Sequence, residues 1–333
     1  MPDPTPILEV ARLVKHFPLR RGLFGRRQGS IIAVDGISFT VHSGETLGIV
    51  GESGCGKSTT ARMIVKLIAP TSGTIHLQGE NITGLTARQM WPHRKRIQFI
   101  FQDPYSSLNP RLSAGEIVGE PLINYAVARG RALEEHVAQL FTRVGLRPEH
   151  SKKYPHEFSG GQRQRLGIAR ALALNPAIIV ADEPVSALDV SVQAQVINLM
   201  LDLQKQYRLS YLFIAHDLAV VQHISHRVAV MYLGRIVELA NKQDLFASPQ
   251  HPYTEALLDA VPVPEPLRVR ALEVLAGEVP SPMRPPPGCH FHTRCPYAEA
   301  RCRVEAPAMR EVKPGHFAAC HLRPPLRQAA QAA

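Results

Sequence analysis

The 333-residue sequence has no long apolar run; its apolar stretches, such as 177–181, 211–215 and 228–233, are five or six residues long. A membrane-spanning helix needs about 20 apolar residues, so the sequence predicts none. The first ten residues contain prolines and acids where a signal peptide would have a basic and then an apolar segment. We therefore expect the chain to remain in the cytosol.

Cysteine is scarce, with five in the whole chain. In a reducing compartment such cysteines are more often ligands or free thiols than a disulfide framework. A hydrophobic content of 45% and a charged content of 20% exclude a disordered or collagen-like chain. The length suggests about two domains. The sequence shows no internal repeat and no long heptad run, so it predicts one cassette and no coiled coil.

The net charge of +10 is concentrated at the two ends of the chain. Residues 1–30 hold six basic and two acidic side chains, and residues 262–333 hold ten basic and six acidic ones. Such a surface suits nucleic acid or an anionic membrane face, and an ordinary solvated surface has the same composition. The sequence lacks a basic patch interleaved with aromatic residues, so we expect no nucleic-acid partner.

Short strand-like runs alternate with helix-like segments, which predicts an α/β core. Strands are expected at 7–14, 31–41, 46–50, 96–101, 177–181 and 211–215, with a hairpin over 227–239. Helices are expected at 59–68, over most of 111–175, and from 192 onward with Ser191 as its N-cap. Residues 262–288 contain eight prolines, which predicts a linker or irregular arm. We therefore divide the chain into residues 1–260 and 261–333.

Residues 51–58 (GESGCGKS) match the phosphate-loop pattern G-x-x-x-x-G-K-[ST], between an expected strand and an expected helix. Glycines allow successive N–H groups to point into one anion-sized concavity. Lys57 would reach the β- and γ-phosphates, and the Ser58 hydroxyl would bind Mg²⁺. Cys55 is interpreted as a small filler in this loop. The expected ATP-binding residues here are Gly51, Ser53, Gly54, Cys55, Gly56, Lys57, Ser58 and Thr59.

The apolar run before residue 182 ends in two acids. Asp182, at the carboxyl end of a strand, is placed to hold the Mg²⁺ shell. Glu183 is then placed to deprotonate a water that faces the γ-phosphate, as a general base. Two acids after a strand also occur in solvated turns, but the phosphate loop favours the catalytic interpretation.

Residues 158–165 (FSGGQRQR) form a second candidate anion site. A serine hydroxyl, two glycines and a helix N-terminus would accept a phosphate there. A kinase with a phosphate loop needs no such second site, whereas two cassettes that sandwich a nucleotide do. The segment resembles the signature motif of ABC ATPases, with Phe158 at the usual leucine. This resemblance implies that Ser159, Gly160, Gly161 and Gln162 act in trans on a partner's ATP.

The resemblance to ABC ATPases covers residues 7–260. It implies an ABC-type nucleotide-binding domain of the P-loop NTPase class, with a RecA-like core, an antiparallel β subdomain and a helical signature subdomain near 111–175. Gln102 resembles the Q-loop glutamine, which touches Mg²⁺ together with Ser58 and Asp182. His216 resembles the switch histidine, and Phe17 is the candidate for the aromatic residue that stacks on adenine. Ser186 and Asp189 resemble the D-loop.

A narrower resemblance is to the ATPases of oligopeptide and dipeptide importers. It is carried by residues 101–110 (FQDPYSSLNP), the insertion at 20–25, and residues 251–254 (HPYT). It implies an "F"-type ATPase that pairs with a paralogous ATPase on two permease subunits, served by a periplasmic or lipid-anchored peptide-binding protein. It also implies a peripheral location on the cytoplasmic side of the bacterial inner membrane.

The resemblance leaves the transported solute open, because these residues do not touch it. Related importers carry nickel, glutathione or murein peptides. A soluble ABC ATPase acting on ribosomes or DNA is the alternative of another class, but such relatives fuse two cassettes or insert a long coiled coil, and this sequence does neither.

Four cysteines follow the proline-rich segment as C-x5-C-x6-C-x17-C: Cys289, Cys295, Cys302 and Cys320. Four thiolates suit zinc or an iron–sulfur cluster, although the close cysteine pair usual for zinc is missing. The importer resemblance implies a [4Fe–4S] cluster, and four unligated cysteines remain the alternative. Every nucleotide motif lies before residue 217, so we expect ATP hydrolysis to be independent of these cysteines.

Overall fold

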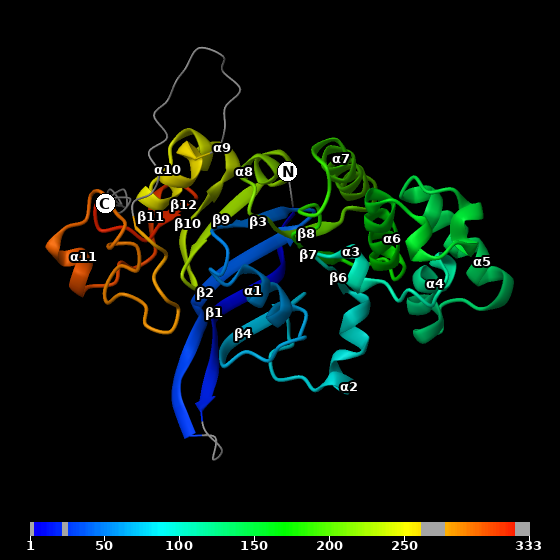
Figure 1. The fold of residues 1–333 in the computed structure, drawn as a ribbon, viewed down its shortest axis with the longest axis horizontal. Helices are drawn as coiled ribbons and strands as arrows, with labels where there is room; N and C mark the ends of the chain where they lie inside the picture. Colours follow the sequence, from blue (N-terminus) through cyan, green and yellow to red (C-terminus); the bar gives the residue numbers. More distant parts are fainter. Residues whose placement is uncertain (1–2, 22–25, 261–276, 324–333) are drawn as a thin grey trace, which may run out of the picture.

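The structure is a computed structural model that describes residues 3–21, 26–260 and 277–323 (Figure 1). Its centre is an eight-stranded sheet in the order β11-β12-β10-β9-β3-β8-β7-β6. The strands from β9 to β6 in that order pair in parallel, and β10, β12 and β11 add antiparallel strands at one edge. The bounds are β3 (Thr46–Val50), β6 (Ile97–Ile100), β7 (Ile178–Asp182), β8 (Ser210–Ile214), β9 (Arg227–Tyr232), β10 (Arg235–Asn241), β11 (Arg310–Lys313) and β12 (His316–Ala318).

A second, four-stranded antiparallel sheet has the order β2-β1-β4-β5. Its strands are β1 (Asp3–Arg21), β2 (Arg26–Ser43), β4 (Ser72–Leu77) and β5 (Glu80–Asn81). The strands β1 and β2 continue into the segment expected as an insertion at 20–25, because Pro18 pairs with Ser30 and Arg20 with Arg27. It therefore lengthens the β1–β2 hairpin, which projects from the body of the molecule (Figure 1). Residues 22–25 lie outside the described residues.

Helices surround the sheets. They are α1 (Lys57–Ile64), α2 (Ala87–Met90), α3 (Pro104–Ser107), α4 (Ala114–Asn124), α5 (Gly130–Arg143), α6 (Gly160–Leu172), α7 (Val190–Tyr207), α8 (Leu218–Ile224), α9 (Lys242–Ala247), α10 (Pro252–Asp259) and α11 (Ala300–Val304). Short 3₁₀ turns occur at η1 (Pro92–Lys95), η2 (Pro148–Lys152) and η3 (Pro155–Glu157). Across the three described ranges, no helix has the length and apolar character needed to cross a bilayer.

The continuous apolar runs of the parallel strands have both faces buried. Successive side chains of a strand point to opposite faces. In β7, Ile179 and Ala181 belong to one apolar cluster, and Ile178 and Val180 belong to the other. Strand β8 follows the same alternation. Burial on both faces explains why these strands lack the polar alternation of a half-exposed sheet.

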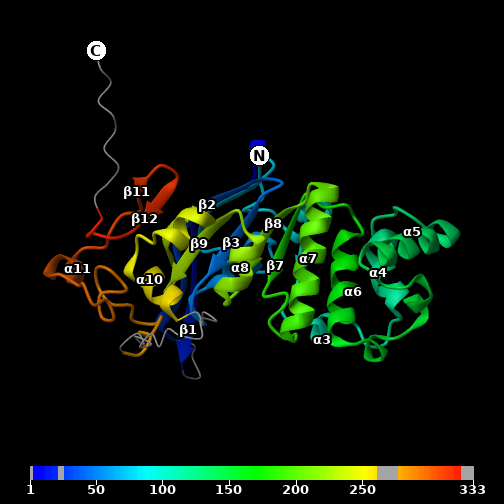
Figure 2. The same ribbon diagram turned by 90° about the horizontal axis from the view of Figure 1, so that it is seen from above.

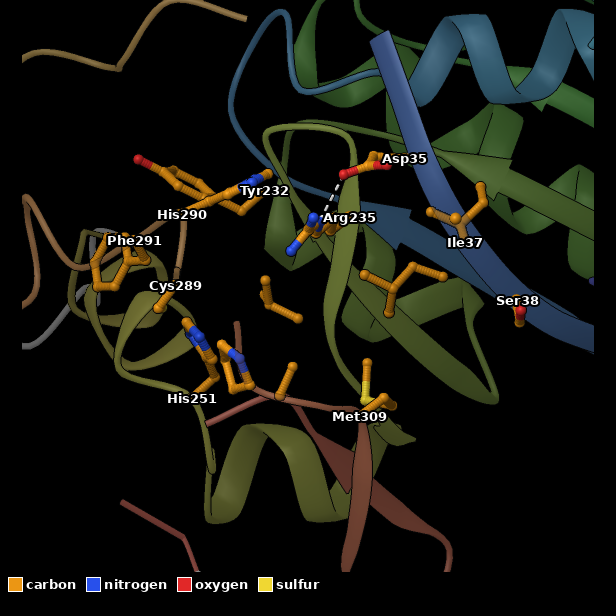
Figure 3. Close-up of a pocket in the computed structure, with 15 residues that line it drawn as sticks. Asp35, Ile37, Ser38, Tyr232, Arg235, His251, Cys289, His290, Phe291 and Met309 are labelled. Carbon is orange, nitrogen blue, oxygen red and sulfur yellow. Dashed lines mark hydrogen bonds and ion pairs between the residues drawn. The ribbon is translucent and has the colours of Figure 1, made fainter. Parts of the chain in front are cut away.

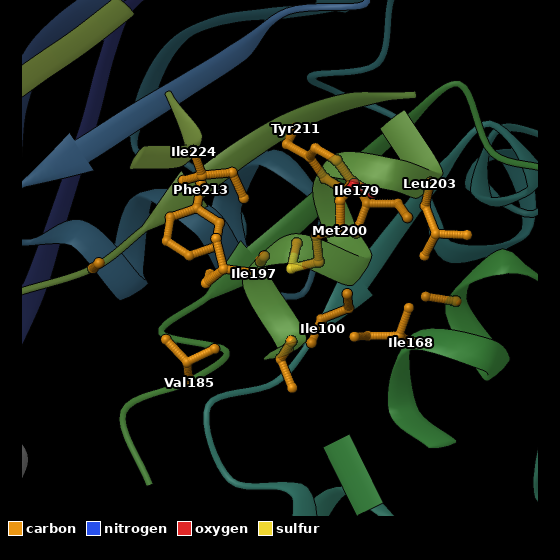
Figure 4. Packing of buried hydrophobic residues seen from close by; sticks show 14 of the residues in the cluster. Ile100, Ile168, Ile179, Val185, Ile197, Met200, Leu203, Tyr211, Phe213 and Ile224 are labelled. Carbon is orange, nitrogen blue, oxygen red and sulfur yellow. Dashed lines mark hydrogen bonds between the residues drawn. The ribbon is translucent and has the colours of Figure 1, made fainter. Parts of the chain in front are cut away.

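The first cluster joins the sheet to α7 and to the helical region (Figure 4). Side chains of α7, among them Ile197, Met200 and Leu203, lie against Ile179 and Tyr211 of the sheet. The second cluster fills the space between the antiparallel sheet, α1 and the other face of the eight-stranded sheet. Both clusters together hold β3, α1 and the ends of β7 and β8 in fixed relation.

Two regions flank the sheet at opposite ends (Figures 1 and 2). Helices α3 to α6, with η2 and η3, gather beyond the β6 edge and confirm the expectation of a mostly helical segment at 111–175. The C-terminal residues 277–323 gather at the other edge. This arm was expected to be irregular, but it contains α11, β11 and β12, and β12 pairs with β10.

Two details of the expected helices were wrong. Helix α1 runs from Lys57 to Ile64 instead of 59–68, because Gly56 is its N-cap and Lys66 adopts a positive φ of 59° that ends the helix. The N-cap of α7 is Asp189 instead of Ser191, since the N–H groups of Val192 and Gln193 donate to the Asp189 carbonyl. Residues 261–276, which hold much of the expected linker, lie outside the described residues.

Candidate functional site

The phosphate loop lies between β3 and α1, as the sequence predicts. Gly51, Gly54 and Gly56 have positive φ values of 152°, 80° and 106°. A Cβ at Gly51 would lie 2.1 Å from the Met231 carbonyl oxygen, and one at Gly56 would lie 2.1 Å from that of Ala33. Glycine is therefore required by backbone conformation and by close packing. The N-terminus of α1 has no side-chain cap, so its N–H groups are available to an anion.

Lys57 and Cys55 are both buried beside this loop. The Lys57 ammonium donates to the carbonyl oxygens of Gly51 (2.7 Å) and Glu52 (3.0 Å). Burial raises the pKa of the Cys55 thiol, which leaves it neutral at physiological pH. A neutral, buried thiol agrees with the interpretation of Cys55 as a filler.

Ser58 and Asp182, both expected at Mg²⁺, are brought together from α1 and the end of β7. The Ser58 hydroxyl donates to Asp182 Oδ1 at 2.9 Å. Burial raises the pKa of Asp182, and the bond from Ser58 opposes that effect. A buried carboxylate beside a hydroxyl is a donor set that Mg²⁺ accepts.

Two further predicted residues, Gln102 and His216, converge on the carboxylate of a third, Glu183. Glu183 Oε2 accepts a hydrogen bond from Gln102 Nε2 at 2.9 Å and lies 3.3 Å from His216 Nδ1. Glu183 has a positive φ of 47°, a conformation that a residue with a side chain adopts at a cost of about 1 kcal/mol or more. Its N–H donates to the Ile214 carbonyl, which fixes it at the end of β8. Backbone strain of this kind concentrates at functional sites.

The D-loop candidates follow Glu183 directly. Ser186 Oγ donates to the Glu183 carbonyl at 3.0 Å, and the exposed Asp189 begins α7. Thr59 lies in α1, one residue beyond Ser58, and Ser53 lies exposed in the phosphate loop.

The signature segment is a helix start, as predicted. Ser159 caps α6, and Ser159 and Gln162 form a reciprocal capping box in which each backbone N–H donates to the other side chain. A Cβ at Gly161 would lie 2.4 Å from Val192 Cγ1 of α7, so this glycine is required within its own chain. Gly160 is less confined, with Leu188 at 3.4 Å from such a Cβ. The Ser159 side chain is exposed.

Phe17 lies on the β1–β2 hairpin, half-buried, with the Lys15 ammonium 4.9 Å from its ring centroid. It pairs with Ile31 of β2, and Ala33, two residues further along β2, packs against the phosphate loop at Gly56. The structure thus places Phe17 on the hairpin that borders the phosphate loop.

The four arm cysteines, Cys289, Cys295, Cys302 and Cys320, line one small cavity as free thiols. Burial raises the pKa of Cys289, Cys320 and Cys295, the last to about 11, and the neighbouring thiols reinforce the effect. Within the described part of the chain, no group of three or more His, Cys, Asp or Glu side chains is arranged to hold a metal ion. The structure therefore gathers the four cysteines around one cavity without arranging them as metal ligands.

The arm meets the cassette around a cavity of about 320 Å³ (Figure 3). Cys289, His290 and Phe291 of the arm line it together with Tyr232 and His251 of the cassette. Phe291 is buried, and its ring lies 5.3 Å from that of Tyr232 between centroids. The arm is therefore packed onto the nucleotide-binding part of the chain.

Sequence reasoning missed one residue at the phosphate loop. Arg294 of the arm forms an ion pair with Glu52, the second residue of the loop, at 2.8 Å. Tyr253 of α10 accepts a hydrogen bond from the Glu52 N–H at 2.9 Å. No local pattern signals these contacts, because Arg294 lies 242 residues from Glu52 in the sequence.

A phosphate loop, two acids at the end of a parallel strand and a separate capped serine-glycine turn define an ABC-type ATPase. Residues 34–186 match the family described as ABC transporter, and residues 237–302 match the one described as Oligopeptide/dipeptide transporter, C-terminal region. The chain belongs to the family of ATP-binding subunits of oligopeptide and dipeptide ABC transporters.

Two curated relatives match along nearly the whole chain. The oligopeptide transport ATP-binding protein AppF of Bacillus subtilis is 55% identical over 95% of this chain and 97% of its own length. A protein of Sinorhizobium fredii named "Probable peptide ABC transporter ATP-binding protein y4tS" is 56% identical over 96% of this chain and 90% of its own.

Solved structures confirm the ABC ATPase fold. The ATP-binding cassette MJ0796, in a dimeric structure bound to ADP and Pi, is 28% identical, with a TM-score of 0.63 over 71% of this chain and 98% of that one. CbiO1 from Clostridium perfringens, part of an ABC transporter complex, is 27% identical with a TM-score of 0.62 over 73% and 92% of the two chains.

Proposed function

We propose that this protein hydrolyses ATP to power the import of di- or oligopeptides through a bacterial ABC transporter. The observation that carries the proposal is the convergence of Gln102 and His216 on Glu183, beside a phosphate loop whose Ser58 contacts Asp182. Residues 1–260 would form the ATPase domain and residues 261–333 the arm typical of this transporter family. The relatives named for peptide transport support the choice of cargo.

Each site residue has a role in this proposal. The loop N–H groups and Lys57 bind the phosphates, and Ser58, Gln102 and Asp182 hold Mg²⁺, which neutralises charge on the phosphates. Glu183 takes the proton of the attacking water, and His216 contacts the γ-phosphate. Phe17 stacks on adenine from the neighbouring hairpin.

The active unit is proposed to be a dimer with a paralogous ATPase. Ser159 is exposed although it belongs to an anion-binding turn, so its natural ligand would be ATP on a partner. The dimeric structure of MJ0796 supports such an arrangement.

The membrane partners are proposed to be two permease subunits, with a peptide-binding protein delivering the cargo. Exposed apolar side chains lie in or next to α2, α3 and α4: Trp91, Phe101, Tyr105 and Ile123. Apolar surface of this kind marks sites of protein contact. Docking there would place this chain peripherally on the cytoplasmic side of the inner membrane.

The cargo is the part of the proposal that the site residues do not address. None of them faces a transported solute, so nickel, glutathione or murein peptides would use the same motor. A soluble role on nucleic acid or ribosomes is the weaker alternative, because the arm family at 237–302 is described for transporters. Co-purification with two permeases would distinguish a transporter subunit from a soluble ATPase.

We also propose that Cys289, Cys295, Cys302 and Cys320 hold a [4Fe–4S] cluster. What supports the proposal is the residue type and the gathering of the residues: the four free thiols line one cavity, and four cysteine thiolates are the usual ligands of such a cluster. When bound, the cluster would cross-link the arm. Anaerobically purified protein should be brown, with iron and acid-labile sulfide in about equal amounts. Cys302→Ser should bleach it and Cys55→Ser should not; zinc without iron, or no metal, would contradict the cluster.

The ATPase proposal is tested with two variants. Glu183→Gln should keep ATP binding but lower hydrolysis by about 10²–10⁴-fold, because it removes the general base. Lys57→Ala should instead weaken ATP binding, because it removes the cation that faces the phosphates. A normal turnover of Glu183→Gln, or a normal ATP affinity of Lys57→Ala, would contradict these roles.

The role in trans requires a variant that leaves the chain's own packing intact. A large residue at Gly161 would clash with Val192 of α7, so it cannot isolate the dimer contact. Ser159→Asp keeps a side chain that can cap α6, but it adds an anion that faces the partner's phosphates. It should block ATP-driven pairing and leave ATP binding by the isolated chain unchanged. Equal loss of both would show that the turn serves its own loop.

A further inference from the structure

We propose that Arg294 of the C-terminal arm is a positioning residue for the phosphate loop, which neutralises and orients Glu52 so that the loop accepts the phosphates of ATP. The inference rests on the phosphate-loop assignment made above. It makes the arm part of the nucleotide-binding apparatus, although every nucleotide motif lies elsewhere in the chain.

The contact has the geometry of a strong ion pair. Arg294 Nη1 donates to Glu52 Oε2 at 2.8 Å, and Nη2 donates to Oε1 at 3.0 Å. The arginine side chain has 5% of its surface exposed and the glutamate side chain 26%. Two parallel bonds fix orientation as well as distance, and limited exposure reduces screening by salt.

Glu52 is held through its backbone as well. Its N–H donates to Tyr253 Oη at 2.9 Å, and its carbonyl accepts from Lys57 Nζ at 3.0 Å. The same residue thus connects the arm, α10 and the lysine expected to face the phosphates. A change in the Glu52 side chain would be transmitted to the peptide group that orients Lys57.

The ion pair affects ATP binding through the charge of Glu52. Glu52 places a carboxylate inside a loop whose function is to bind an anion, and an unpaired carboxylate there would repel the phosphates. Arg294 cancels that charge. The loop is then already in its binding conformation and carries no net charge at Glu52, which lowers the free-energy cost of binding the phosphates of ATP.

Arg294 is itself fixed by the fold of the arm. Its N–H donates to the Phe291 carbonyl at 3.0 Å, and its guanidinium lies 6.0 Å from the Tyr232 ring centroid. Phe291 packs in turn between Tyr232 and Tyr253. The arginine therefore approaches the loop from an anchored turn, adjacent in sequence to Cys295.

The test measures the dissociation constant of a fluorescent ATP analogue with the purified full-length chain. Arg294→Ala should raise it about tenfold, the size expected for loss of a charge-assisted contact. Arg294→Lys keeps the charge but loses the paired geometry, so it should raise it about threefold. Arg323→Ala is the matched control: it breaks another arm-to-cassette ion pair, with Glu255 at 2.7 Å, away from the loop. The control should change affinity by less than about twofold.

Rescue distinguishes a charge role from a purely structural one. Glu52→Gln removes the carboxylate, so the Arg294→Ala/Glu52→Gln double variant should return to within about twofold of the native affinity. The defect of Arg294→Ala should also shrink as salt is raised. Affinity that stays low in the double variant, or an Arg294→Ala affinity equal to that of Arg323→Ala, would overturn the proposal. Normal affinity in Lys57→Ala would instead refute the phosphate-loop assignment on which it rests.

Discussion

The helical region beyond β6 adds many buried side chains to the larger apolar cluster, whereas the arm at the opposite edge adds few and is joined to the cassette by polar and ionic contacts as well. Helix α5 buries Val137, Leu140 and Phe141 in the larger apolar cluster. In the arm, Phe291 is the only large apolar side chain that is fully buried among the described residues. The arm is joined as well through the ion pairs of Arg294 and Arg323 and through the buried contact of His316 with Glu238.

The difference shows two ways of attaching a region to a common core. Apolar burial is non-directional, so the helical region can be stable through packing alone. The buried pair of His316 and Glu238, at 2.6 Å with both side chains inaccessible, needs an exact partner and loses stability when one partner is removed. The arm therefore depends on the cassette for its structure, and the following predictions test that contrast.

The largest effect is expected in the helical region. Phe141→Ala should lower the free energy of unfolding by about 3–5 kcal/mol, because it leaves a cavity in a fully buried site. Urea unfolding measures the loss. Phe101→Ala, at a phenylalanine with 38% of its surface exposed, is the control and should cost far less. Equal losses would show that the helical region does not depend on its apolar core.

Acid should lower the free energy of unfolding through His251, which lies where the arm meets the cassette. Burial lowers the pKa of His251 to about 4, while Glu238 and Arg323 act on it in opposite directions. The unfolded chain takes up this proton near pH 6.5, so stability is complete above that pH and declines as pH falls toward 4. The loss should reach about 3 kcal/mol at pH 4. Urea unfolding at several pH values measures it.

The control for the acid effect is His251→Gln. Glutamine keeps a hydrogen-bonding side chain where His251 Nδ1 accepts from the Tyr253 N–H, but it does not titrate. The variant should lose this part of the pH dependence between 6.5 and 4. An unchanged pH profile would show that other groups cause the acid sensitivity.

A smaller effect is expected at a helix start. Ser113 caps α4 in a reciprocal box with Glu116, so Ser113→Ala should cost about 1 kcal/mol. In the arm, the N-cap of α11, Glu299, makes no capping bond, and Glu299→Ala should leave the melting temperature unchanged. Thermal unfolding compares the two. A cost at Glu299 equal to that at Ser113 would remove this difference between the regions.

The smallest effect concerns an exposed ion pair of the arm. Arg301 and Glu305 bond at 2.8 Å, but both side chains are more than half exposed. Exposed pairs contribute little because water and salt screen them. Arg301→Ala should leave the melting temperature and the ATP affinity unchanged. A clear loss of either would mean that the arm relies on its surface charges as well as on its buried ones.

Much of the nucleotide site could be predicted from sequence, because its parts are local patterns. The glycines of residues 51–58, the acids after β7 and the turn at 159–162 are recognised by spacing within a few residues of each other. The apolar runs that became β7 and β8 also follow from a local period. Helix ends were less predictable, as Asp189 shows, since several nearby residues can cap a helix.

The sequence by itself determined the chemistry of the site: a phosphate loop, a pair of acids, a capped serine-glycine turn and four clustered thiols are properties of residue type and short spacing. Only the tertiary structure decided which of these groups meet. The approach of Gln102 and His216 to Glu183, the pairing of β12 with β10, and the ion pair between Arg294 and Glu52 join residues far apart in the chain. Such contacts depend on how whole helices and strands pack against each other, and a local residue pattern does not predict that packing.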